Sequence, residues 1–195
     1  VICYNLIVMV SIKLSDGSKK KFSSSITGFE LAKSISSSLS KSAVAISING
    51  ELKDLNFEIK KDCDVKIITK ETDVGIEIIR HDAAHVLAEA VKLLYPDVQV
   101  TIGPPIKNGF YYDFSKKKPF TPEDLIKIEK KMLEIINNNM PFEREVWDRK
   151  KAISFFKNEG EIYKTEIIND ISKNDEISIY KQGKFLDLCK GPHSP

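Results

Sequence analysis

Histidine and cysteine are scarce in this chain, with three residues of each among 195. The cysteines are scattered at Cys3, Cys63 and Cys189, which is not the clustered set of a disulfide-stapled domain, so we expect a reducing compartment. The apolar residues 1–10 fall short of the ~20 residues that a membrane-spanning helix needs, and they lack the leader and cleavage site of a secretory signal. We therefore expect a cytoplasmic protein with no membrane partner.

The net charge is also small, at +2. This argues against a protein whose whole surface binds nucleic acid, although lysines at 19–21 and 116–118 leave local phosphate contacts open. Solvated loops are the interpretation we favour for both clusters. A hydrophobic content of 42% with 30% charged residues is typical of a folded protein, and the length favours two modest domains.

Residues 8–70 have the pattern of one small unit. Alternating strands at 8–14 and 19–22 flank the turn at Asp16-Gly17, and strands follow at 43–48 and 65–69. Thr27 and Glu30 have the capping-box spacing of a helix start. The helical spacing predicts that Phe29, Ala32, Ile35 and Leu39 are buried. Strands around one helix predict an α+β fold of the β-grasp (ubiquitin-like) kind.

Residues 71–195 form a second predicted unit, also α+β. It begins with a long helix over 74–95, which Pro96 ends. Strands are predicted at 99–102, 109–114 and 143–147. Helices are predicted from Thr121 to about 138, with residues 125, 128, 132 and 135 inward, and over 148–156 and 163–168. A hairpin at 177–180 and 185–188 leads into Cys189.

All three histidines lie in two short motifs. His81 and His85 are four residues apart on the long helix, so their side chains lie about 40° apart on one face. Cys189 and His193 are also four apart, but Gly191-Pro192 between them predicts a turn. Spacing alone leaves two chemistries open. One is a tetrahedral zinc site, which spacing mildly favours, and the other is metal-free hydrolysis with His81 orienting a water.

The motifs in the second unit match, in order and spacing, those of bacterial threonyl-tRNA synthetases. The matching segments are 81–85 (HDAAH), 102–104 (IGP), 108–113 (NGFYYD), Tyr163-Lys164 and 187–193 (DLCKGPH). The resemblance implies an extension at 1–8, a TGS domain at 9–70 and a threonyl/alanyl-type editing domain at 71–195. It implies the N-terminal region of a threonine–tRNA ligase, in which only the editing activity is present.

In that family the editing site hydrolyses serine from mischarged threonine tRNA, so the expected partners are the tRNA acceptor end and the seryl ester. The resemblance implies two groups of site residues. The catalytic group is His81, Lys164 and Cys189, and the substrate-binding group is His85, Tyr112, Asp187 and His193, with Tyr112 and Asp187 facing the amino group or the terminal adenosine.

The resemblance also implies a metal-free site without a cofactor. ATP, magnesium and zinc are expected only in the aminoacylation core, which nothing in these residues resembles, and the full-length enzyme is expected to be a homodimer. Two other functions stay open. One is a non-catalytic tRNA-binding or regulatory module, and the other is a free-standing zinc-dependent aminoacyl-tRNA deacylase.

Overall fold

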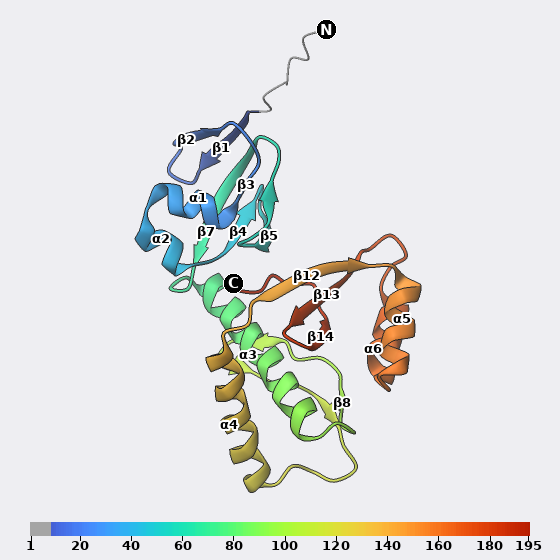
Figure 1. Cartoon of the computed structure of the whole chain (residues 1–195). Helices are drawn as coiled ribbons and strands as arrows, with labels where there is room; N and C mark the ends of the chain where they lie inside the picture. Colours follow the sequence, from blue (N-terminus) through green and yellow to red (C-terminus); the bar gives the residue numbers. More distant parts are fainter. Residues whose placement is uncertain (1–8) are drawn as a thin grey trace. The chain divides into compact units, whose positions relative to one another are not determined.

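The computed structural model describes residues 9–195, so the predicted extension at 1–8 lies outside the described residues. The chain divides into two compact units. The first comprises the described residues up to Ile79 together with Pro192–Pro195, and the second is Arg80–Gly191. The division falls within helix α3 (Asp73–Leu94) (Figure 1). Among the described residues, no helix combines the length and apolarity needed to cross a membrane.

A five-stranded mixed sheet forms the first unit. Its order is β2-β1-β7-β4-β5, with β1 (Val10–Leu14) parallel to β7 (Cys63–Thr69) and the other pairs antiparallel. The edge strands are β2 (Lys19–Phe22) and β5 (Glu51–Asp54), and β4 (Ala43–Ile48) lies between β7 and β5. A small pair, β3 (Ile26–Thr27) and β6 (Glu58–Ile59), lies beside them. The predicted β-grasp arrangement is confirmed for this unit.

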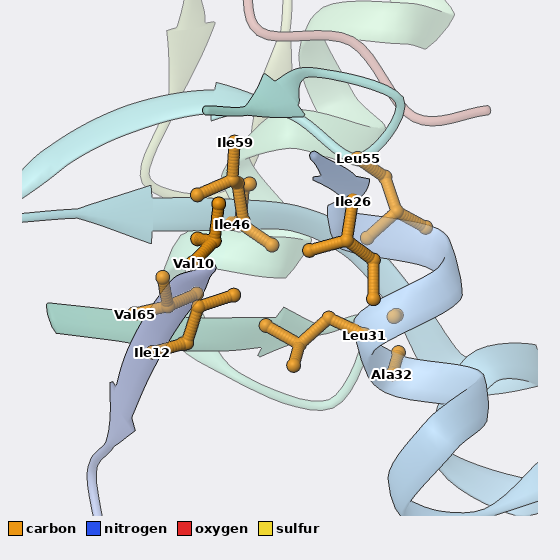
Figure 2. Close-up of a cluster of buried hydrophobic side chains, with 10 residues drawn as sticks. Val10, Ile12, Ile26, Leu31, Ala32, Ile46, Leu55, Ile59 and Val65 are labelled. Atoms are coloured by element: carbon orange, nitrogen blue, oxygen red, sulfur yellow. The ribbon is translucent and has the colours of Figure 1, made fainter. Parts of the chain in front are cut away.

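Helix α1 (Gly28–Ile35) covers this sheet and begins at the predicted capping box, in which Thr27 and Glu30 bond reciprocally. The prediction of the buried face is confirmed at Ala32, with Leu39 partly buried against the same cluster, and is wrong at Phe29 and Ile35. Phe29 and Ile35 are each 40% exposed, whereas Leu31 is fully buried beside Ala32 and points into the apolar cluster between helix and sheet (Figure 2). The buried arc of α1 is centred on Gly28, Leu31 and Ala32, so Phe29 lies off it. Ile35 is the last residue of the helix, next to the break at Ser36 that precedes α2 (Ser37–Ser42).

In the second unit, α3 packs against α4 (Pro122–Asn138). Val86, Ala90 and Val91 of α3 form an apolar cluster with Ile128 and Ile135 of α4. The prediction for α4 is therefore confirmed at 128 and 135, with residue 132 packed at the margin, and is wrong at 125, which is 58% exposed.

The second unit also contains a three-stranded antiparallel sheet and a helix pair. The sheet order is β12 (Phe142–Trp147), β13 (Ile177–Gln182) and β14 (Phe185–Leu188), so the predicted hairpin is confirmed. Helices α5 (Arg149–Asn158) and α6 (Ile162–Asp170) lie side by side (Figure 1). Asp148 caps α5 through the backbone N–H groups of residues 150 and 151. Ala152, Phe156 and Ile168 pack onto β13.

The aromatic segment after α3 forms short strand pairs. The single strand predicted over 109–114 is wrong, because its two ends pair with different partners. β10 (Gly109–Phe110) pairs with β9 (Pro105–Ile106), and β11 (Phe114–Ser115) pairs with β8 (Gln99–Val100). Tyr112 lies between the two pairs and is buried against Ala84 and Ala88 of α3.

Candidate active site

Helix α3 places both of its histidines in the second unit. The His81 and His85 ring centroids are 4.9 Å apart with the planes inclined at 73°. His85 is buried and His81 is half-buried. The i, i+4 spacing therefore produces adjacent rings, as the helical geometry requires.

Cys189 follows β14 and lies against the first of these histidines. Its Sγ is 3.3 Å from His81 Nε2, and the Gly191 N–H donates to the same sulfur at 3.2 Å. The Cys189 N–H donates to the Ser178 carbonyl at 3.1 Å, and the Ser178 hydroxyl donates to the Cys189 carbonyl. The hairpin therefore fixes the cysteine backbone on both sides, with the sulfur directed at the imidazole.

The turn after Cys189 requires glycine. Gly191 has φ +69°, and a Cβ there would lie 1.9 Å from the hydroxyl oxygen of Tyr180, which is buried. A side chain would meet both the left-handed backbone penalty and this ring. Gly191 therefore lies close to Tyr180 while its N–H donates to the cysteine sulfur.

A second cluster of polar groups centres on Asp187 of β14, which is 1% exposed. Its Oδ1 lies 2.5 Å from Lys164 Nζ of α6. Its Oδ2 accepts from the Tyr112 hydroxyl at 2.9 Å and lies 3.4 Å from His85 Nδ1. Lys164 also donates to the Tyr112 oxygen at 3.1 Å. One carboxylate thus connects a lysine, a phenol and a histidine from three different segments.

Burial further stabilises the neutral form of the Tyr112 phenol. It raises the Tyr112 pKa well above 10, and the nearby Asp187 charge raises it further. The phenol is therefore neutral at physiological pH. It can donate to Asp187 while accepting from Lys164.

A pocket of about 430 Å³ opens beside these clusters and has Lys164 and Cys189 in its wall. The other lining residues are Ile102, Ile167, Asp170, Ile171, Ser172, Asp175, Glu176, Ser178, Leu188 and Lys190. A buried ammonium and a half-buried thiol at one small pocket are the arrangement expected of a reactive site.

His193 lies in Pro192–Pro195, which belongs to the first unit. There its side chain is buried and its backbone N–H donates to Asp54 Oδ1 at 2.9 Å. Chain connectivity keeps its Cα within about 14 Å of the Cys189 Cα, since four residues extend no further.

The donor set also fits a metal ion. The ligand atoms of His81, His85 and Cys189 lie within 4.8 Å of one another, and two imidazoles with one thiolate are suitable zinc ligands. Asp187 would be the outer partner of His85 through Nδ1, as is usual for metal-bound histidines. The geometry of these residues accommodates both chemistries left open by the sequence.

Sequence reasoning missed Ser178 and Tyr180, which position Cys189. Both lie on β13, where Ile179 pairs with Leu188. Extending the predicted hairpin by one residue would have placed Ser178 opposite Cys189. No sequence feature indicates the role of Tyr180, because its contact with Gly191 depends on the turn that follows the strand.

The comparisons with known proteins agree with this organisation. Residues 10–69 match the TGS domain family. The chain is 54% identical over 187 residues to a protein named threonine–tRNA ligase from Rickettsia akari, 57% over 185 residues to one from Pelagibacter ubique, and 53% over 187 residues to one from Azoarcus sp.. These alignments cover 95–96% of the chain and 29% of each relative.

The chain is homologous to the N-terminal region of threonine–tRNA ligases. The resemblance found in the motifs is thus confirmed, as are the TGS domain and its β-grasp fold in the first unit. The chain spans about 29% of the length of the curated relatives that it matches.

Proposed function

We propose that the second unit is an editing domain, an aminoacyl-tRNA deacylase that hydrolyses serine from mischarged threonine tRNA. One observation carries the proposal. Lys164 and Cys189 share the wall of one pocket, and His81 contacts the cysteine sulfur at 3.3 Å. The homology to threonine–tRNA ligases supports the substrate class.

The chemistry of the two amino acids explains why such a site is needed. Serine lacks one methyl group of threonine, and a missing methylene-sized group gives only about 1–3 kcal/mol of discrimination in a binding pocket. A second site that admits serine and excludes threonine supplies the remainder.

In the proposed reaction, a water oxygen attacks the ester carbonyl carbon while His81 accepts the water proton. The Lys164 ammonium stabilises the negative charge that develops on the carbonyl oxygen. The bond to the ribose oxygen then breaks, and His81 returns the proton to that oxygen. The products are serine and a tRNA with its terminal hydroxyl restored.

Asp187 and Tyr112 act through Lys164 in this scheme. Their contacts with its ammonium at 2.5 and 3.1 Å fix its position. That they contact the substrate's amino group or terminal adenosine remains a prediction, as do the pocket-lining roles of His85 and His193.

The test is release of serine from seryl-tRNA by the full chain, with threonyl-tRNA as the comparison substrate. We expect hydrolysis of the seryl ester and its loss in His81→Ala, Lys164→Met and a His81→Ala/Cys189→Ala double variant. Lys157→Met, an exposed change on α5, is the matched control and should keep full activity. Equal rates for the wild type and the double variant would refute the proposal. Salt-dependent tRNA binding without hydrolysis would instead favour the tRNA-binding module.

The contact of His85 Nδ1 with Asp187 favours a second candidate, zinc-dependent hydrolysis at the same residues. There, His81, His85 and Cys189 would hold the ion, which would supply an activated water. We propose the metal-free site and expect no stoichiometric zinc in protein purified without added metal. One zinc per chain in elemental analysis would select the alternative.

A further inference from the structure

A separate cavity of about 210 Å³ lies in the second unit, between the C-terminal half of α3, the end of α5, the start of α6 and the β13–β14 turn. Its lining differs from that of the pocket at Lys164 and Cys189. The lining residues are Glu89, Lys92, Leu93, Val100, Phe155, Phe156, Glu159, Glu161, Lys184, Phe185 and Leu186.

The size and walls of this cavity fit a small flat molecule. Phe155, Phe156 and Phe185 provide three aromatic side chains, and Val100 and Leu186 add aliphatic ones. A cavity of about 150 Å³ with apolar walls holds benzene. The volume here therefore admits a six-membered ring with a short substituent.

Two charged groups of the lining are already satisfied. The Lys92 ammonium donates to the carbonyls of Pro96 and Val98 at 2.8 and 3.0 Å and lies 2.6 Å from Glu161 Oε1. Glu161 Oε2 accepts from the Val100 N–H at 2.9 Å. Glu159 and Lys184, two other charged residues of the lining, are exposed to solvent.

Glu89 is different. Its Oε2 is buried, and within residues 9–195 it has neither a hydrogen-bond donor nor an ion-pair partner. Burial raises the Glu89 pKa to about 7. A carboxylate in an apolar cavity is unfavourable unless it is paired, so a cation beside Glu89 would be stabilising.

We propose that this cavity is a second ligand site, which binds a small flat molecule carrying a protonated amine or amidine through Glu89 and the three phenylalanines. The site adjoins the Asp187 cluster through shared elements. Glu89 follows His85 by one turn of α3, Glu161 precedes Lys164 by three residues, and Leu186 precedes Asp187. An effect of the ligand on ester hydrolysis would depend on the proposed function. Binding of the ligand to this cavity does not depend on it.

The probe is benzylammonium, with benzyl alcohol as its uncharged match, and the measurement is binding to the full chain by ligand-detected NMR titration. At pH 8 we expect saturable binding of the cation and at least tenfold weaker binding of the alcohol. Glu89→Gln should weaken cation binding at least tenfold. Lowering the pH to 6 should do the same, because about a tenth of a carboxyl with a pKa near 7 stays ionised there.

Two further variants separate the cavity from general effects. Leu93 is 59% exposed at the rim, so Leu93→Trp should block the cavity without unfolding the chain. Glu129→Gln removes an equal charge from the exposed side of α4 and should leave binding unchanged. The proposal is overturned if benzylammonium does not bind, or if it binds Glu89→Gln or Leu93→Trp as tightly as the wild type. Binding of the cation without any seryl-tRNA hydrolysis would overturn the proposed function alone.

Discussion

The two units are stabilised in different ways. Across residues 9–79, no charged side chain is buried, and the interior is the aliphatic cluster around Leu31 and Ile46. Between residues 80 and 191, the buried side chains include Asp82, Glu161, Lys164 and Asp187. A buried ion pair is weak evidence for stability, because desolvation offsets much of the attraction. The second unit therefore maintains a costly arrangement that the first unit lacks, which is the expected signature of a site.

The largest expected effect comes from breaking that arrangement. Asp187→Asn removes the charge that pairs with buried Lys164 and should cost about 3–5 kcal/mol of unfolding free energy. Its match in the first unit is Asp64→Asn, which breaks an exposed pair with Lys13 at 3.8 Å and should leave stability unchanged. Urea denaturation of the full chain measures both. Similar losses of unfolding free energy in the two variants would contradict the claim that only the second unit depends on a buried ion pair.

A cavity in the aliphatic core of the first unit should also destabilise the chain, but it should not change the rate of hydrolysis at the proposed site. Leu31→Ala deletes a fully buried side chain of the first unit and should cost about 2–5 kcal/mol. We expect the rate of seryl ester hydrolysis per folded molecule to stay at the wild-type value. A fall in that rate, measured where the chain is still fully folded, would show that the core of the first unit also affects hydrolysis in the second.

Two glycines test the cost of close packing at the site. Gly191→Ala and Gly50→Ala both place a side chain at positive φ, at +69° and +91°. A Cβ at residue 50 meets nothing within 4 Å, so only the backbone penalty of about 1 kcal/mol applies. A Cβ at residue 191 meets the Tyr180 hydroxyl, which should add about 1–3 kcal/mol and reduce hydrolysis. Equal destabilisation by the two changes would argue against the Tyr180 contact.

The unpaired carboxyl of the second unit predicts a pH dependence. The Glu89 pKa is about 7 in the folded chain, above the ordinary glutamate pKa of 4.5, so the folded state binds more protons between these values. Unfolding free energy should therefore fall as the pH rises from 4.5 to 7. After allowing for its partial exposure, the loss is about 1–2 kcal/mol. Glu89→Gln should reduce the dependence of unfolding free energy on pH and should be more stable than the wild type at pH 8. An unchanged pH dependence in that variant would mean that other groups cause it.

The smallest expected loss of stability comes from removing a helix cap, and it should be equal in the two units. Thr27→Ala and Thr121→Ala each remove a capping box at a helix N-terminus, and each should cost about 1 kcal/mol. Thermal unfolding of the two variants checks this. A large difference between them would mean that one cap also supports tertiary packing.

The features predicted correctly from the sequence are local ones. The capping box at Thr27, the start of α4 after Thr121, the end of α3 near Pro96 and the hairpin before Cys189 depend on residues close together in the chain, where propensity and turn chemistry decide the outcome. Phe29 and Ile35 of α1 were wrongly predicted to be buried, because the position of the buried arc and the end of the helix depend on how the helix meets the sheet, which a helical wheel does not represent.

The site could be predicted in part. The spacing of His81 and His85 on a helix predicted adjacent rings, and the resemblance nominated Lys164 and Asp187. Nothing in the sequence indicated that these last two are partners of each other, since they come from different elements and meet only in the folded unit. Glu89 was missed for the same reason, because its lack of a partner is a property of the surrounding packing.

The shared carboxylate of Asp187 also limits how this sequence can change. Tyr112, Lys164 and His85 all contact its two oxygens, so the effects of substituting them cannot be independent. A variant that lacks Asp187 leaves the buried Lys164 ammonium and the Tyr112 hydroxyl without their carboxylate acceptor. Positions 112 and 164 should then tolerate substitutions that the wild type does not. The four positions should therefore behave as one epistatic unit, whose members are exchanged together or retained together.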